Sequence, residues 1–377
     1  MAERPIPGAG AVGSRLDALI RASKTPGIQY VVVKPERIAF EYAGGRADIA
    51  ARRPMNVATT MMAYSMTKII TAVAVLQLVE AGAVRLDSPA DSYLESLPYG
   101  SEVTVRQLLA HTSGVPHPIP LSWVHPAERH DAFDERAALA AVLRKHPKLS
   151  FPPGTRYRYS NIGYWLLGQI VERVSGEGFS SYVAERVLRP LGITPAEVGF
   201  AVPHQRNHAQ GYLEKYSFLN LVKRFLIDRA LIGEYQANWL HIHDHYLNGA
   251  AFGGLVGTAR GFGRFLQDQL RPRSRLFSNT TRRLLYTPQH IRNGKAIPVT
   301  LGWHIGAMGG TRYYYKEGGG GGFHCLMRLY PASGVGTVVM TNATGFNVAG
   351  FLDEADPHFL AATAPPVGTG RSHTPGH

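Results

Sequence analysis

The chain has little that would place it outside the cell or in a membrane. A single cysteine, Cys325, among 377 residues excludes an internal disulfide. The most apolar run, IITAVAVLQLV from Ile69, is shorter than the roughly 18 residues that a membrane-spanning helix needs. The N-terminal MAERPIPGAGAVG lacks the charged and apolar regions of a secretory signal. We therefore expect a cytoplasmic protein, while an exported form that has lost a leader stays open.

Acidic residues are also scarce, since 27 Asp and Glu stand against 40 Lys and Arg, a formal net charge of +13. A basic surface attracts acidic partners such as nucleic acid or anionic lipid. The basic residues are scattered, however, and no nucleic-acid-binding motif accompanies them, so we interpret them as a solvated surface and expect no nucleic-acid partner. The chain is 45% hydrophobic and can bury the core of one large domain or two interleaved ones.

Strand-like runs occur near both ends of the chain, and helical patterns fill the middle from residue 104 to 270. Two further helices are expected at 14–22 and 347–360. The strand-like runs are IQYVVVK, RIAFEYAG, PVTLGWHIG, TRYYYKE, GGFHCLMRLY and GVGTVVMTN.

This order of elements predicts two domains. An α/β domain would combine residues 1–62 with 271–362, and a helical domain, 63–270, would be inserted into it. The tail, 363–377, is rich in Pro and Gly and is expected to be disordered. The cleft between two such domains is the expected place for a small-molecule site.

The stretch AYSMTK places Ser65 three residues before Lys68 at the start of an apolar helix. Positions i and i+3 share one face of a helix, so the Lys68 amine can reach the Ser65 hydroxyl. A serine needs a base to become a good nucleophile, and burial of a lysine lowers its pKa toward the range of such a base. The pattern is common by chance, but Ser65 is the only serine here with a lysine three places on.

Two further patterns lie downstream. Tyr159 and Asn161 form a Y-x-N directly before a helix, and Lys316 and Gly318 form a K-x-G at a glycine-rich strand end. A phenol beside two ammonium groups is expected to shift toward phenolate and to transfer protons. The glycines would let a substrate lie against the strand, with the Gly319 N–H as an oxyanion donor. An Asn-capped helix start and a flexible glycine hairpin are the structural alternatives.

In this order, the three patterns resemble those of the penicillin-recognising serine hydrolases. The resemblance is closest to class C β-lactamases, D-alanyl-D-alanine carboxypeptidases of the same branch and class VIII-type esterases. It also covers TVRQLLAHTSGV, FPPGTRYRYSNIGYWLLGQIVE, LRPLGI and GGLVGTARGFGRF. It implies a β-lactamase/transpeptidase-like α/β (α+β) fold, in which N- and C-terminal helices flank an antiparallel sheet that carries an inserted all-α domain.

The resemblance implies a serine hydrolase without a cofactor. No E-x-x-L-N signature of a class A glutamate base is present, which favours the branch that uses a tyrosine. The implied catalytic residues are Ser65, Lys68 and Tyr159; the implied substrate-binding residues are Asn161, Lys316, Glu317 and Gly318; and the implied oxyanion donors are the N–H groups of Ser65 and Gly319.

Glu317 departs from the family pattern, which often has Thr or Ser at this place. If its carboxylate faces the cleft, it would repel a substrate carboxylate, so an ester or an uncharged amide is expected as the small-molecule substrate. β-Lactamase activity and D-amino-acid peptidase or carboxypeptidase activity are the alternatives. A non-catalytic binding protein on the same fold is a third, and the oligomeric state stays open.

The segment 204–248 is rich in aromatic residues, and an amphipathic basic helix is expected at 218–229. This helix could form the wall of an acyl pocket, a packed surface helix or a weak contact with a membrane surface.

The HIHDH stretch, 241–245, suggests a metal site, but its spacing differs from the H-x-H-x-D-H of metallo-β-lactamases. The glycines from Gly318 to Gly322 lack the G-K-[ST] ending of a phosphate loop. We therefore expect no metal and no nucleotide.

Overall fold

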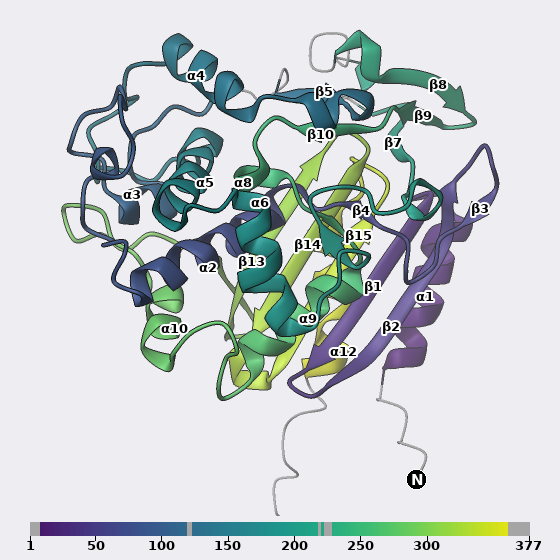
Figure 1. Ribbon diagram of the computed structural model, residues 1–377. Helices are drawn as coiled ribbons and strands as arrows, with labels where there is room; N and C mark the ends of the chain where they lie inside the picture. The colour runs from purple at the N-terminus through teal and green to yellow at the C-terminus, as the bar shows by residue number, and fades with distance from the viewer. Residues whose placement is uncertain (1–7, 119–122, 218–219, 222–227, 361–377) are drawn as a thin grey trace, which may run out of the picture.

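The computed structural model describes residues 8–118, 123–217, 220–221 and 228–360. Its centre is a seven-stranded antiparallel sheet in the order β12-β13-β14-β15-β1-β2-β3 (Figure 1). The strands are β1 (Gly27–Lys34), β2 (Arg37–Asp48), β3 (Arg53–Pro54), β12 (His304–Met308), β13 (Thr311–Gly320), β14 (Phe323–Tyr330) and β15 (Val335–Thr341).

The two ends of the chain meet in the middle of this sheet. β1 pairs with β15, so that Ile28 lies opposite Thr341 and Val31 opposite Val338. In Figure 1 the first strands (purple) accordingly lie beside the last ones (yellow-green). Both strands are rich in valine and buried along almost their whole length, as expected for central strands that are covered on both faces.

Helices cover both faces of the sheet (Figure 1). Alternation along β14 sends Leu326 into the core of one face and Cys325 and Met327 into the core of the other. The first face is covered by α1 (Ala9–Arg21), α11 (Val348–Ala355) and α12 (Pro357–Leu360), and the second by α9 (Ala259–Leu270) and the helical middle of the chain.

The central element of the helical middle is α2 (Thr67–Glu80), which follows the 3₁₀ turn η1 (Tyr64–Met66). Nearly every side chain of α2 is buried, because helices pack around it and its sequence is apolar on all sides. The other helices here are α3 (Val105–Leu109), α4 (Glu135–Lys145), α5 (Asn161–Ser175), α6 (Phe179–Tyr182), the π-helix η4 (Val183–Leu188), α8 (Ala250–Gly253) and α10 (Asn279–Tyr286).

The prediction of an all-helical middle was wrong in one respect, because this part also contains small sheets. The alternating apolar residues Leu213, Leu240 and Ile242 form a separate small core in one of them. The sheets are β4 (Met61–Met62), β11 (Val256–Gly257) and β6 (Val198–Gly199); β7 (Gly211–Glu214), β9 (Trp239–Ile242) and β8 (Ile232–Gln236); and β10 (His245–Leu247) with β5 (Val124–Pro126). The helix expected at 218–229 falls mostly outside the described residues.

The proposed division into domains stays a prediction. α9 belongs to the predicted helical domain, yet it packs on β1 and β15 of the sheet. One continuous apolar core also joins α2 and α5 to the sheet. The predicted tail, 363–377, lies outside the described residues. Within the part of the chain that the structure describes, no helix combines the length and the apolar character needed to cross a membrane.

Candidate active site

Ser65 lies in η1, directly before α2, and this turn contacts β13 of the sheet. Lys68 follows one turn later in α2, and its Nζ is 3.0 Å from Ser65 Oγ. The sequence spacing predicted this local contact, and the structure brings the two side chains together. Ser65 is half-buried, whereas Lys68 is fully buried.

Lys68 Nζ has two further fixed partners. It donates to Asn161 Oδ1 at 2.8 Å and to the carbonyl oxygen of Phe252 at 2.6 Å. Both partners are acceptors and take two of the amine hydrogens. The remaining position on the nitrogen faces Ser65, so it holds either a third hydrogen or, in the neutral amine, the lone pair. As long as Ser65 is not acylated, a proton exchanged by Lys68 is therefore exchanged with Ser65.

The charge state of Lys68 favours this exchange. Burial, and after it the charge of Lys316, lower the pKa of Lys68 well below its ordinary value. Burial removes the water that would stabilise an ammonium, and a nearby positive charge repels it. A neutral amine is consequently accessible to Lys68 much closer to neutral pH than it is to an exposed lysine.

Tyr159 contacts Ser65 from the opposite side. Its hydroxyl lies 2.7 Å from Ser65 Oγ, and its ring lies 4.9 Å from Lys68 Nζ and 5.2 Å from Lys316 Nζ. The expected shift toward phenolate was wrong in direction. Burial raises the pKa of Tyr159 above its ordinary value, and the hydrogen bond with Ser65 only partly opposes this. Tyr159 is therefore a neutral phenol that can donate a proton.

Asn161 is the first residue of α5, whose start is capped by Ser160 Oγ accepting from the Gly163 N–H at 3.0 Å. This cap fixes the backbone of Asn161, so that Oδ1 can hold Lys68. The structure thus gives Asn161 a contact with the lysine, and its implied contact with substrate stays a prediction.

Lys316 lies on β13 and is fully buried. Its Nζ donates to the carbonyl oxygen of Gly302 at 3.1 Å, and its ammonium faces the ring of Tyr159. Burial lowers the pKa of Lys316 from 10.5 to about 7. The K-x-G pattern therefore reaches the same site as the other two patterns, although it lies in a strand far along the chain.

The shifted pKa of Lys316 makes stability depend on pH. The unfolded chain, with an ordinary lysine, binds more protons than the folded chain between about pH 7 and 10.5, so the free energy of unfolding is expected to rise over this range. Lys316→Met should reduce this rise without removing it, because Lys68 is shifted in the same direction. Urea unfolding at several pH values measures both, and an identical slope in the two proteins would contradict the assignment.

Gly318 faces Ser65 across the contact between β13 and η1. A Cβ at this position would collide with the carbonyl oxygen of Ala63 and lie 2.8 Å from Ser65 N. The glycine is therefore required for the close approach of the strand to the nucleophile's backbone.

Gly318→Ala is expected to push β13 away from η1. We expect a loss of stability of about 1–3 kcal/mol and a loss of hydrolysis of about 100-fold, because the backbone of Ser65 must move. Thermal unfolding and ester turnover measure the two effects. Gly13→Ala in α1, where a Cβ would meet nothing within 4 Å, is the matched control; it should leave turnover unchanged and raise stability by up to about 1 kcal/mol. Equal behaviour of the two variants would show that the close approach is not needed.

The expectation that Glu317 faces the cleft is contradicted. Side chains alternate along a strand, and Lys316 and Gly318 occupy the face toward Ser65. Glu317 lies on the other face, where its Oε1 is 2.7 Å from His324 Nε2. Its carboxylate is therefore no barrier to a substrate carboxylate. Gly319 shares that face with Glu317, and the implied role of its N–H stays a prediction.

Sequence reasoning missed two groups of residues at this site. The carbonyl of Phe252 holds Lys68, and no sequence signal marks it, since every residue has a carbonyl. Three histidines surround Tyr159, with ring centroids 4.3 Å away for His111, 5.3 Å for His117 and 6.5 Å for His304. His111 and His117 lie in or beside the quoted stretch TVRQLLAHTSGV, which could have marked them.

The three histidines around Tyr159 are uncharged at neutral pH. Burial lowers the pKa of His117 to about 4 and that of His304 to about 2, and nearby lysines lower them further. Burial and the same lysines also lower the pKa of His111. In the part of the chain that the structure describes, every titratable side chain that shifts these histidines or Lys68 is itself a base.

The histidines of the HIHDH stretch bind protein groups. His241 Nε2 lies 2.5 Å from Gln210 Oε1, and His245 contacts Tyr64 and the carbonyl of His243. Among the described residues, no group of three His, Cys, Asp or Glu side chains could hold a metal ion.

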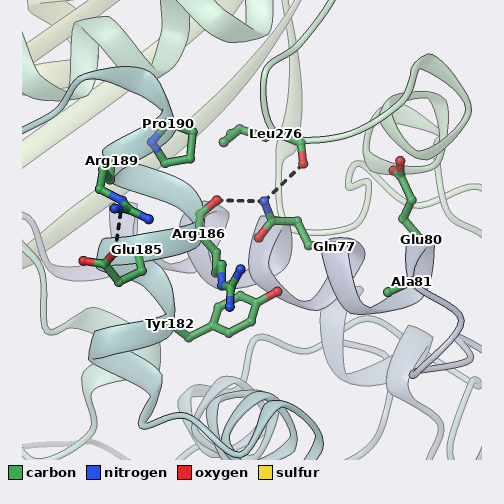
Figure 2. Close-up of a pocket in the computed structure, with 9 residues that line it drawn as sticks. All are labelled: Gln77, Glu80, Ala81, Tyr182, Glu185, Arg186, Arg189, Pro190 and Leu276. Carbon is green, nitrogen blue, oxygen red and sulfur yellow. Dashed lines mark hydrogen bonds and ion pairs between the residues drawn. The ribbon is translucent and has the colours of Figure 1, made fainter.

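An open pocket lies near the end of α2 that is farther from Ser65 (Figure 2). Some of its polar groups pair with one another: Glu185 with Arg189, and the Gln77 side chain with the carbonyl oxygens of Arg186 and Leu276. It contains none of the predicted catalytic residues. The full lining is Gln77, Glu80, Ala81, Tyr182, Glu185, Arg186, Arg189, Pro190 and Leu276.

Known proteins share this architecture. The structure of a D-amino acid amidase from Ochrobactrum anthropi SV3 matches it with a TM-score of 0.77, covering 94% of this chain and 98% of the amidase. At 21% sequence identity this likeness concerns the fold alone, and it confirms the β-lactamase/transpeptidase-like fold. A family model described as Beta-lactamase matches residues 15–359, so the chain belongs to the beta-lactamase family. The resemblance drawn from the motifs is thereby confirmed.

Two curated relatives differ in their activities. The chain is 31% identical over 202 residues to a D-aminopeptidase of Cereibacter sphaeroides (strain KD131), which covers 54% of this chain and 39% of the relative. It is 34% identical over 218 residues to esterase EstB of Burkholderia gladioli, which covers 52% of this chain and 55% of the relative. The chain thus spans about half the length, or less, of these relatives.

Proposed function

We propose that the protein is a serine hydrolase that forms an acyl-enzyme at Ser65 and acts, like a carboxylesterase, on small or hydrophobic esters. One observation carries the proposal: Ser65 Oγ is hydrogen-bonded by Lys68 Nζ on one side and by the Tyr159 hydroxyl on the other. A nucleophile with a base and an acid at hydrogen-bond distance is the arrangement that acyl transfer needs.

The proton path follows from the charge states. Neutral Lys68 takes the proton of Ser65 as Oγ attacks the substrate carbonyl. The leaving alkoxide takes the proton of the Tyr159 phenol, which is protonated before the reaction because burial raises its pKa. Lys68 then returns its proton to Tyr159. A water molecule repeats the steps on the acyl-enzyme and releases the acid, with the Ser65 N–H as one donor to the developing oxyanion.

The surroundings of Ser65 favour a substrate without a free ammonium group. Among the described residues, the charged side chains that shift the pKa values of Lys68 and the three histidines are lysines, histidines and Arg158, so none of them is a carboxylate that could form an ion pair with a substrate ammonium. A desolvated ammonium without a partner is costly to bind. This counts against a free D-amino-acid amide, which is the substrate type that the name of the D-aminopeptidase relative suggests. It agrees with an ester substrate, which the name of the esterase relative suggests.

A second candidate is a carboxylate-bearing amide such as a β-lactam. Its supporting observation is the position of Glu317, which lies on the far face of β13 and leaves Lys316 without a competing carboxylate in the cleft. Lys316 could then supply a charge-assisted contact to the substrate.

Three substrates separate the alternatives: p-nitrophenyl butyrate, a chromogenic cephalosporin and D-alanine p-nitroanilide. We expect the ester to turn over fastest and the anilide slowest, with all activity lost in Ser65→Ala. Faster turnover of the cephalosporin would establish the second candidate. Faster turnover of the anilide would contradict the argument from the basic site. No activity and no labelling by a fluorophosphonate would leave a binding protein on the same fold.

A further inference from the structure

Tyr64, the residue before Ser65, has a left-handed backbone with φ 44°. A residue with a bulky side chain rarely adopts this conformation, because its Cβ approaches the following carbonyl. Such a conformation persists where surrounding contacts hold it, and it commonly occurs at functional sites. The turn sets the direction of the Ser65 backbone, so whatever holds Tyr64 also orients the serine.

The side chain of Tyr64 spans the distance from η1 to the end of β13. Its hydroxyl donates to the carbonyl oxygen of Gly321 at 2.9 Å. Its ring lies against Gly320, where an added Cβ would be 2.5 Å from two ring atoms. The strand that carries Lys316 and Gly318 is therefore joined, at its glycine end, to the residue that precedes Ser65.

His245 of β10 holds the same hydroxyl from the other side. Its Nε2 lies 3.1 Å from the Tyr64 hydroxyl, and its Nδ1 lies 2.9 Å from the carbonyl oxygen of His243. A carbonyl only accepts, so Nδ1 carries the ring hydrogen, and the neutral ring offers the lone pair of Nε2 to Tyr64. The phenol has a single hydrogen, which is therefore shared between two acceptors, His245 Nε2 and the Gly321 carbonyl oxygen, that belong to different segments of the chain. His245 is buried, so water does not compete for this contact.

A second contact joins the same parts of the backbone. Cys325 Sγ lies 3.1 Å from the carbonyl oxygen of Ala63 and 3.2 Å from that of Gly318. The segment before Ser65 is therefore held to the sheet both at Ala63 and at Tyr64. The contact at Ala63 is made by a thiol, which is a weak donor, whereas the contact at Tyr64 is made by a hydroxyl.

We propose that Tyr64 and His245 are positioning residues for the serine hydrolase, which hold the left-handed turn before Ser65 against the glycine end of β13. The inference rests on the proposed function. Neither side chain has to touch the substrate. Their effect passes through the backbone of Ser65, because during attack its Oγ must face the carbonyl carbon of the substrate while its N–H faces the carbonyl oxygen.

The test compares Tyr64→Phe with the wild type by two measurements, the second-order rate of Ser65 labelling by a fluorophosphonate and the kcat and KM for p-nitrophenyl butyrate. Tyr64→Phe removes only the hydroxyl and keeps the ring on Gly320. We expect kcat and the labelling rate to fall about 10- to 100-fold, the size expected for a small misplacement of the nucleophile, with KM within about twofold of the wild-type value. Tyr99→Phe is the matched control, since it removes a buried tyrosine's hydrogen bond to the carbonyl of His146 outside the site.

A second pair of variants tests His245 independently. His245→Ala should reduce the labelling rate, and His245→Gln, which can still hydrogen-bond the phenol, should recover at least half of the loss on a logarithmic scale. Thermal unfolding shows that each variant is folded. A folded Tyr64→Phe that is labelled at the wild-type rate would overturn the positioning role while leaving the proposed function intact. A wild type that is not labelled at Ser65 would overturn the proposed function, and the positioning role with it.

Discussion

Ser65→Ala is expected to lower the turnover of p-nitrophenyl butyrate by about 10⁴-fold or more, the size seen when the nucleophile of a serine hydrolase is removed. The physical reason is that no other group can form the acyl-enzyme. Lys68 and Tyr159 keep their positions through Asn161, Phe252 and the packed rings around them, but they have no atom to activate. Stopped assays of purified protein measure the rate, and mass spectrometry of the fluorophosphonate-treated wild type locates the label.

The matched control for this variant is Ser175→Ala. Ser175 Oγ donates to the carbonyl oxygen of Val171 at 2.7 Å, at the far end of α5, so its loss removes a serine hydrogen bond outside the site. Its turnover should equal that of the wild type. If Ser65→Ala retains more than about a tenth of the wild-type rate, acylation of Ser65 is not the reaction that the assay reports.

Lys68→Arg is expected to reduce kcat about 10²- to 10⁴-fold, the range that a general base contributes. Arginine keeps the positive charge and can donate to Asn161 and Phe252, but it does not lose a proton in a protein. A merely structural cation would therefore tolerate the change better than a base would. Lys68→Met, which removes both charge and base, should be about equally slow. An arginine variant with near wild-type activity would exclude the base role, and Lys34→Arg, at the end of β1, is the control for the chemical change itself.

The pH dependence of kcat/KM tests the same base. Protonated Lys68 cannot accept the Ser65 proton, so the rate should rise with pH as the lysine becomes neutral. Because burial and Lys316 lower the pKa of Lys68, the inflection should lie well below 10.5. An activity that rises only near pH 10.5 would contradict this assignment.

The sequence predicted best what depends on short spacings. Ser65 and Lys68 meet because they are one helical turn apart, a relation that holds in any fold. Tyr159 and Lys316 reach the same site only because the whole chain folds, and in the sequence only the resemblance to a family indicated that they would.

Two predictions about the site were wrong, the position of Glu317 and the charge state of Tyr159, and each has a physical reason that the sequence partly indicates. Glu317 was expected in the cleft, yet it neighbours Lys316 on a strand, and alternation alone places two successive side chains on opposite faces. The phenolate state of Tyr159 was expected from the two lysines, but burial lowers the charge of those lysines and raises the pKa of the phenol at the same time.

The fold of 204–248 was the least predictable part of the chain. Its many aromatic residues fit a helix stripe and a strand equally well, because both elements place large side chains on one face. The pairing of β7 with β9 depends on contacts between residues 25 to 31 positions apart, which local patterns do not contain, whereas β8 and β9 form a short hairpin.

The pairing of β1 with β15 has a consequence for the making of the protein. Ile28 must wait for Thr341 before its strand has a neighbour on that side, and a ribosome working at 5–20 residues per second needs roughly 15–60 s to synthesise the segment between them. During this time the first hairpin exposes an unpaired strand edge, and β13 does not yet exist to meet Ser65. No nascent fragment that ends before β13 can therefore have the complete site, and a chaperone that shields strand edges would be needed most while the helical middle is being synthesised.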